Sequence, residues 1–185
     1  MDRFSIIVGD ITQSDADAIV NAANHTLLGG SGVDGAIHQA AGPALLSECR
    51  TLGGCATGAV KLTSGHRLRA RYILHTVGPI WQGGNMGEPA LLASCYRSCL
   101  ETAAQQGFQR VDFPSISTGV YGYPLPLAAP VALKAIMDFL ASHDTPNQVR
   151  MICHTKAAAD IYRQTWNMWY AEDKAHRMVP EEGEL

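Results

Sequence analysis

Short β-rich runs alternate with helical stretches along the chain, and this alternation constrains the fold more than any other feature of the sequence. Six runs are predicted as strands, at residues 4–8, 17–20, 59–63, 72–77, 110–113 and 149–153. Five stretches are predicted as helices, at residues 36–41, 44–52, 89–106, 127–142 and 157–169. Several strands are continuously apolar, as expected where both faces of a sheet are covered. The sequence therefore predicts an α/β fold with helices on both faces of a largely parallel or mixed sheet.

Local signals refine this outline. Gly107 is expected to cap the third helix at its C-terminus. Pro130 is expected in the first turn of the fourth helix, because proline breaks a helix interior. A chain of 185 residues can bury one real core, so we expect one domain at residues 1–170 and a polar tail at 171–185.

Charge and cysteine content limit the classes of partner. The formal net charge is −3, which disfavours general affinity for nucleic acid or for an anionic membrane. An anionic ligand is therefore expected to be bound by backbone N–H groups rather than by a basic surface. No secretory signal is recognised, and no apolar stretch is expected to approach membrane-spanning length. The five cysteines form no framework pattern and indicate reduced thiols in the cytoplasm, and no metal or cofactor is expected.

Residues 29–38, Gly-Gly-Ser-Gly-Val-Asp-Gly-Ala-Ile-His, form the most unusual segment. Glycines let backbone N–H groups converge on an anion, and the start of a helix adds unpaired N–H groups and a positive dipole end. The segment therefore predicts a phosphate site. Asp34 does not fit simple phosphate binding, because a carboxylate repels phosphate. An acidic side chain there indicates chemistry on the ligand, although on local grounds Asp34 could equally cap the helix at 35–41.

A second glycine-bearing loop, at residues 113–124, follows the fifth predicted strand and enters a helix. Two such loops could hold a diphosphate from both sides. Gly30-x-Gly32-x-x-Gly35 formally matches the dinucleotide fingerprint. That fingerprint should follow its strand directly, and here Asn21 to Leu28 intervene, so a Rossmann cofactor site is disfavoured.

Five segments together resemble the macrodomain family, most closely the MacroD-type ADP-ribose hydrolases and O-acetyl-ADP-ribose deacetylases. They are Gly9-Asp10-Ile11-Thr12 and residues 17–24, 29–42, 75–79 and 113–124. The resemblance runs from about Phe4 to Trp166. It implies a three-layer α/β/α sandwich around a central mixed sheet of about six strands, with ADP-ribose bound across the strand ends.

The resemblance also implies roles for individual residues. Asp10 would accept a hydrogen bond from the adenine amino group, with the backbone of Ile11 beside it. One phosphate would be bound by the backbone of Ser31, Gly32 and Val33. The other would be bound by the loop of Ser117, Thr118, Gly119, Val120 and Tyr121. Asn24 and Asp34 would flank the distal ribose as the catalytic pair.

Several alternatives remain open at this point. Asp10 could cap a turn before Thr12. Asn21 is expected to bond the backbone, and His38 and His75 are expected to be structural. Ser31 replaces a glycine usual in the family, which would strain the turn if its φ is positive. His154 stands where relatives often carry an aromatic residue near adenine.

The leading hypothesis is a hydrolase that deacetylates O-acetyl-ADP-ribose and removes ester-linked ADP-ribose from acidic side chains of proteins. A carboxylate such as Asp34 can activate or orient water, and a carboxamide such as Asn24 can position a ribose hydroxyl. The bound phosphate could itself serve as the base. The alternative is a reader module that binds ADP-ribose without turnover, and an RNA-binding role is disfavoured by the net charge.

Overall fold

The structure is a computed structural model that describes residues 3–177, with side chains described for residues 3–169. Its sheet contains β1 (Phe4–Val8), β2 (Ala18–Ala23), β3 (Val60–Ser64), β4 (Tyr72–Val77), β5 (Arg110–Phe113) and β6 (Gln148–Cys153). The order across the sheet is β1-β6-β5-β2-β4-β3. β3 is antiparallel to β4, and the other neighbouring pairs are parallel. The predicted mixed sheet of six strands is confirmed.

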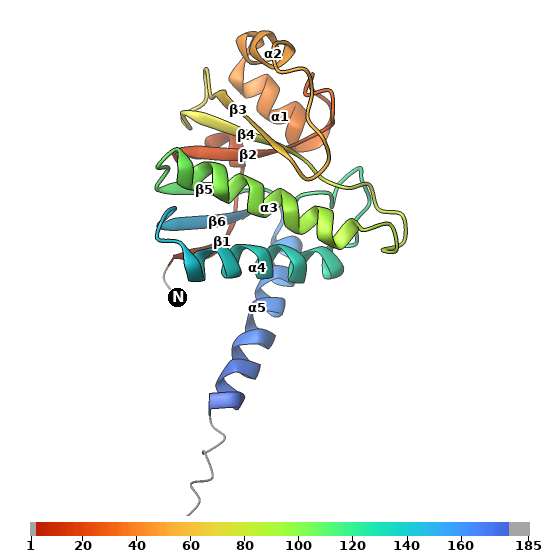
Figure 1. The fold of residues 1–185 in the computed structure, drawn as a ribbon, viewed down its shortest axis with the longest axis vertical. Helices are drawn as coiled ribbons and strands as arrows, with labels where there is room; N and C mark the ends of the chain where they lie inside the picture. The colour runs from red at the N-terminus through yellow and green to blue at the C-terminus, as the bar shows by residue number, and fades with distance from the viewer. Residues whose placement is uncertain (1–2, 178–185) are drawn as a thin grey trace, which may run out of the picture.

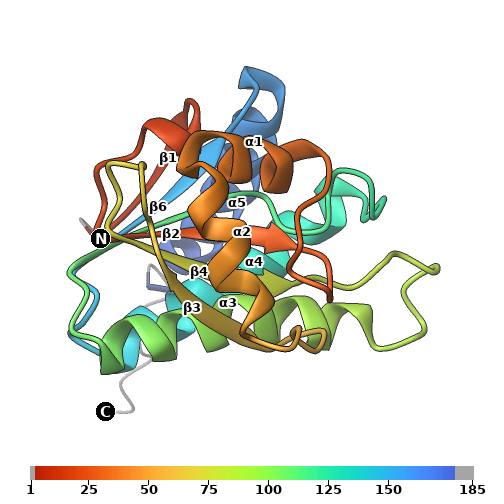
Figure 2. The ribbon, with the colours of Figure 1, turned by 90° about the horizontal axis from the view of Figure 1, so that it is seen from above.

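Helices cover both faces of this sheet (Figures 1 and 2). They are α1 (Gly32–Ala41), α2 (Pro43–Arg50), α3 (Glu88–Gln105), α4 (Leu125–Ser142) and α5 (Lys156–Arg177). Because side chains alternate along a strand, β2 sends Ile19 into the core shared with α1 and α2, and Val20 into the core shared with α3, α4 and α5. The predicted three-layer α/β/α sandwich is confirmed.

Two of the helices differ from the predictions. α4 begins at Leu125, so Pro130 lies at its sixth position, and the prediction that Pro130 lies in the first turn is wrong. Pro126 lies in the first turn instead. The apolar face of α4 that packs into the core continues past Pro130, so the packing of this face outweighs the loss of the one backbone hydrogen bond that Pro130 cannot donate. α5 continues to Arg177, so residues 171–177 of the expected tail are helical, whereas 178–185 lie outside the described residues.

By length and composition, α4 could cross a membrane, because its 18 residues have a mean hydropathy of 1.5. The prediction that no apolar stretch approaches this length is therefore wrong. The helix supplies seven buried side chains, Ala128, Ala129, Ala132, Leu133, Ile136, Phe139 and Leu140, to the core. It packs between α3 and α5, which is the environment of a core helix.

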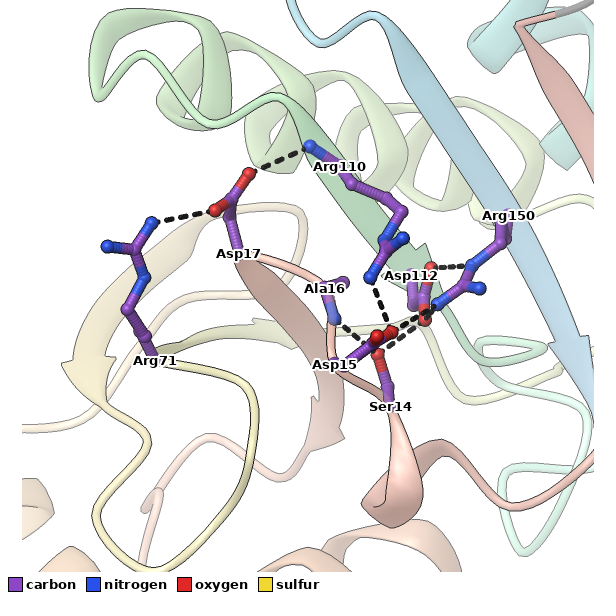
Figure 3. A network of polar contacts seen from close by, with 8 residues as sticks. All are labelled: Ser14, Asp15, Ala16, Asp17, Arg71, Arg110, Asp112 and Arg150. Atoms are coloured by element: carbon purple, nitrogen blue, oxygen red, sulfur yellow. Dashed lines mark hydrogen bonds and ion pairs between the residues drawn. The ribbon is translucent and has the colours of Figure 1, made fainter.

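Charged side chains link neighbouring parallel strands (Figure 3). On neighbouring strands, the guanidinium of Arg150 donates two hydrogen bonds to the buried carboxylate of Asp112, at 2.7 and 2.5 Å. Ser14 also donates to Asp112. Nearby, Asp17 accepts hydrogen bonds from Arg71 and from the backbone N–H of Arg110. This network links β5 to β6 and to the segment that leads into β2.

At the carboxyl ends, β2 and β5 separate. Their pairing consists of Ala18 with Val111 and Ile19 with Asp112, whereas β2 runs on beside β4 as far as Ala23. The connections from β2 and β5 therefore diverge at this point of the sheet. In an open α/β sheet, such a point is where ligands bind.

Candidate active site

A cavity of about 840 Å³ lies at the carboxyl ends of the parallel strands. All of the predicted site residues line it: Asp10, Ile11, Asn24, Ser31, Gly32, Val33, Asp34, Ser117, Thr118, Gly119, Val120 and Tyr121. They come from the loops that follow β1, β2 and β5 and from the first turn of α1. The fold thus brings four separate segments of the chain to one site.

Other lining residues were not predicted. Gly78 follows β4, and Thr155 and Ala158 lie at the junction of β6 with α5. His154, which was singled out only by resemblance, also lines the cavity and is exposed. A threonine two residues after the last strand is the signal that could have indicated the β6 end, because ligands in this class of fold bind where strands end.

The first turn of α1 faces the cavity with its backbone. Ser31 is the N-cap residue, and its side chain makes no capping hydrogen bond. The first N–H groups of any helix lack an intrahelical partner, so those of α1 are open to an anion. Ser31 has a φ of −102°, so the expected strain at this position is absent. The positive φ belongs to Gly32.

Two glycines of this segment are required by packing. A Cβ on Gly30 would lie 2.9 Å from Oδ2 of Asp34, and a Cβ on Gly35 would lie 2.6 Å from the carbonyl oxygen of Gly30. The loop therefore passes directly over the Asp34 carboxylate. This contact explains why glycine occupies both positions.

The loop at residues 117–121 provides the opposite wall. Ser117 has a φ of 67°, and its hydroxyl is buried without a partner among the described residues. The Thr118 hydroxyl oxygen lies 3.0 Å from the carbonyl oxygen and 2.9 Å from the hydroxyl oxygen of Ser115, so it is bonded within the loop. Gly78 is needed here, because a Cβ would lie 2.1 Å from Oγ of Ser117. The backbone is thus held in an unusual, tightly packed conformation beside the cavity.

Asp34 is 4% exposed and lies at the third position of α1. Its Oδ1 accepts a hydrogen bond from Nδ2 of Asn21 at 2.8 Å and lies 3.5 Å from Nε2 of His38. Its Oδ2 has no partner among the described residues. Burial raises the pKa of this carboxyl, and the Asn21 hydrogen bond and the His38 charge oppose that rise. Asp34 does not cap the helix, so the capping alternative is wrong.

Asn21 has a different role from the expected one. Its side chain bonds no backbone group but joins Asp34 to His75, with Nδ2 also 3.1 Å from Nδ1 of His75. No local signal in the sequence could have shown this, because the three residues come together only through the packing of β2, β4 and α1.

The Asn24 side chain braces its own loop. Nδ2 donates to the carbonyl of Gly29 at 2.9 Å, and Oδ1 accepts from the N–H and hydroxyl of Thr26. The second N–H of the Asn24 amide takes no part in these hydrogen bonds. Asn24 is therefore held rigidly at the cavity wall, beside Gly30 and Asp34.

Asp10 caps a turn, as one of the two sequence-based alternatives predicted. Oδ1 accepts from the N–H and hydroxyl of Thr12, at 2.9 and 2.7 Å, and so caps the short turn Ile11–Gln13. Neither bond uses Oδ2. The side chain is exposed and lines the cavity, so one carboxylate oxygen is available to a ligand.

The charged side chains of the cavity wall are carboxylates. Asp10 and Asp34 line it, whereas the lining residues include no lysine or arginine. Burial, and then the nearby Asp34 charge, raise the pKa of Tyr121 in the loop after β5. An anionic ligand would therefore depend on backbone N–H groups and a helix end for its binding.

Comparisons with known proteins agree with this geometry. The family model of the Macro domain matches residues 20–132. A Macro domain-containing protein of Methanosarcina mazei is 56% identical over 156 residues, which cover 84% of this chain and 83% of that protein. A Salmonella typhimurium protein named O-acetyl-ADP-ribose deacetylase is 49% identical over 164 residues, which cover 86% and 92% of the two chains.

Solved structures are similar over most of the chain. The Oceanobacillus iheyensis macrodomain with ADP has a TM-score of 0.87 at 44% identity, covering 90% of this chain and 91% of that one. The Trypanosoma brucei macrodomain in complex with ADP-ribose has a TM-score of 0.83 at 44% identity, covering 88% of this chain and 68% of that one.

Proposed function

This chain belongs to the macrodomain family, and on that premise we propose that it is a hydrolase acting on ester bonds of ADP-ribose. Its substrates would be O-acetyl-ADP-ribose and proteins that carry ester-linked ADP-ribose on acidic side chains. The observation that carries this proposal is Asp34, a buried carboxylate with one unpartnered oxygen at the wall of a cavity otherwise suited to phosphate.

Binding would follow the two loops. The diphosphate would accept hydrogen bonds from the N–H groups of Ser31, Gly32 and Val33 on one side and of residues 117–121 on the other. Asp10 would accept from the adenine amino group through Oδ2. A cavity of about 840 Å³ has the size expected for a ligand of this kind.

Hydrolysis needs a water directed at the ester carbonyl carbon. The water oxygen would attack that carbon, and its proton would pass to Asp34 or to the bound phosphate. The bond from the carbonyl carbon to the ribose oxygen would then break, and the ribose oxygen would take that proton and leave as a hydroxyl. The free N–H of Asn24 would position the ribose. Because burial raises the Asp34 pKa, the rate should fall at a higher pH than an exposed aspartate would give, as the carboxylate becomes protonated.

The test is single-turnover hydrolysis of O-acetyl-ADP-ribose, followed by release of ADP-ribose and acetate. Asp34→Ala should lower the rate at least about a hundredfold, the low end for general acid–base roles, while ADP-ribose still binds. Asn24→Ala should also slow turnover, and the two losses should combine less than additively. Asp138→Ala, which removes an exposed carboxylate on α4, is the matched control.

The outcomes separate the enzyme from a reader module. An inactive wild-type protein that binds ADP-ribose would make the chain a reader. Equal rates in wild type and Asp34→Ala would remove Asp34 from the chemistry. A parallel assay with a protein carrying ester-linked ADP-ribose tests the second substrate class.

A further inference from the structure

His75 lies in the middle of β4 and is fully buried, and its ring does not line the cavity. Nδ1 lies 3.1 Å from Nδ2 of Asn21, and Nε2 lies 2.8 Å from the hydroxyl oxygen of Thr63. A fully buried imidazole with a partner on each nitrogen has one fixed orientation. The sheet register places these partners on the adjacent strands β2 and β3.

One assignment of donors and acceptors satisfies all the hydrogen bonds that join Thr63, His75, Asn21 and Asp34. The Thr63 hydroxyl donates to the carbonyl of Ser64, so it accepts from Nε2–H of His75. Nδ1 of His75 is then an acceptor, and the Asn21 amide uses one N–H for His75 and the other for Oδ1 of Asp34. Reversing the Asn21 amide would point its oxygen at the Asp34 carboxylate and repel it.

We propose that His75 is a positioning residue for the reaction, because its neutral Nε2–H tautomer holds the Asn21 amide with both N–H groups toward Asp34 and His75. The carboxylate is thereby held in one rotamer, and the Asn21 hydrogen bond favours its charged form. The other tautomer, or a protonated ring, would place N–H on Nδ1 and favour the reversed amide. The inference rests on the proposed function for its catalytic consequence, but its effect on Asp34 can be measured without turnover.

The remaining titratable groups around this chain of contacts do not compete with it. Burial, and then the His38 charge, lower the pKa of His75 to about 3, so its ring is neutral at working pH. Burial raises the pKa of Cys49 on α2 to about 11, and burial also raises that of Tyr121, so both stay neutral. His38 on α1 lies beside Asp34, and Lys61 on β3 is opposite His75 in register and exposed. Both are unchanged in every variant below.

Three substitutions separate the contacts. His75→Asn can keep an acceptor near Nδ1 for Asn21, whereas His75→Gln can keep a donor near Nε2 for Thr63 and loses the acceptor. Thr63→Val retains volume and removes the acceptor that selects the tautomer. Thr76→Val is the matched control, because Thr76 is the next residue of β4, is fully buried and bonds Ala59 on the other side of the strand.

The first measurement is the ionisation of Asp34, followed by carbon NMR of labelled aspartate, with Asp34→Asn used to assign the signal. His75→Gln and Thr63→Val should raise the Asp34 pKa above that of wild type, because the Asn21 hydrogen bond to the charged form is lost. His75→Asn and Thr76→Val should leave it near the wild-type value. An unchanged Asp34 pKa in folded His75→Gln and Thr63→Val would overturn the proposal, whether or not the protein is an enzyme.

The second measurement is the rate profile of the wild-type enzyme and variants. His75→Gln should lower kcat by up to about a hundredfold with little change in KM, since it misplaces a catalytic group without touching the ligand site. The acid limb should move to higher pH, and His75→Asn should recover most of the loss. A loss equal to that of Thr76→Val, with an unmoved acid limb, would contradict the positioning role. An inactive wild type would refute the proposed function alone.

Discussion

At the scale of single residues, the glycines around the cavity are of two kinds: those that packing requires and one that packing does not. Gly30, Gly35 and Gly78 are required because a Cβ would collide with neighbouring atoms. Gly119 is different, since no heavy atom lies within 4 Å of a Cβ built there and its φ is not positive. Gly119 lines the cavity, and packing does not require glycine at this position.

We therefore expect Gly119→Glu to fold normally and to lose ADP-ribose binding, because the carboxylate would occupy space predicted for phosphate. Calorimetric titration with ADP-ribose measures the affinity, and circular dichroism measures the fold. Leu127→Glu adds the same charge at an exposed position at the start of α4 and should bind like wild type. Retained affinity in a folded Gly119→Glu variant would mean that the second loop is misassigned.

At the scale of elements, an ion pair with a buried carboxylate joins the neighbouring strands β5 and β6. Asp112 is fully buried on β5, and Arg150 on β6 donates to both of its oxygens. The pair crosses from one strand to the next, so it links two central strands that the chain connects only through α4.

Asp112→Ala should lower the free energy of unfolding by about 3–5 kcal/mol, because it leaves the Arg150 guanidinium without its partner. Urea unfolding of wild type and variant measures this difference. Lys134→Ala breaks the exposed pair with Asp138 and should cost under about 1 kcal/mol. Equal costs for the two substitutions would show that the Asp112 pair contributes no more than a surface pair.

At the scale of the whole molecule, the net charge does not favour the binding of an anionic ligand. The net charge is −3, and the cavity wall carries carboxylates rather than lysine or arginine. Affinity for an anionic ligand would then come from fixed N–H groups and a helix dipole instead of a diffuse positive field. Such short-range contacts respond less to ionic strength than the counterion release that governs nucleic-acid binding.

ADP-ribose should therefore stabilise the folded protein with little dependence on salt. By mass action, ligand at about a hundred times its Kd should add about 2.7 kcal/mol to the free energy of unfolding. Melting temperatures with ADP-ribose and with AMP, at low and high salt, provide the measurement. AMP should stabilise less at equal concentration, since it lacks the diphosphate. Equal effects of AMP and ADP-ribose, or binding that disappears with salt, would contradict the two-loop assignment.

Much of the architecture could be read from the sequence, because it depends on local signals. The β-rich runs of the sequence placed β1, β4 and β5 at their observed bounds. The glycine-bearing loops marked the site, and together with the family resemblance they selected residues that all line one cavity. Helix ends were less well predicted, as Pro130 and the extension of α5 show, because tertiary packing can outweigh a local helix breaker.

Tertiary structure alone decided what the polar side chains do. The sequence left Asp34 equally suited to capping and to chemistry. In the structure α1 begins at Gly32 with Ser31 as its N-cap residue, so Asp34 lies inside the helix and bonds Asn21 instead. Asn21, His75 and Thr63 are separated by up to 54 residues, and the register of β2, β4 and β3 brings them into one chain of hydrogen bonds. Local patterns carry no information about such register, because it is set by how whole strands pair and how α1 packs on them.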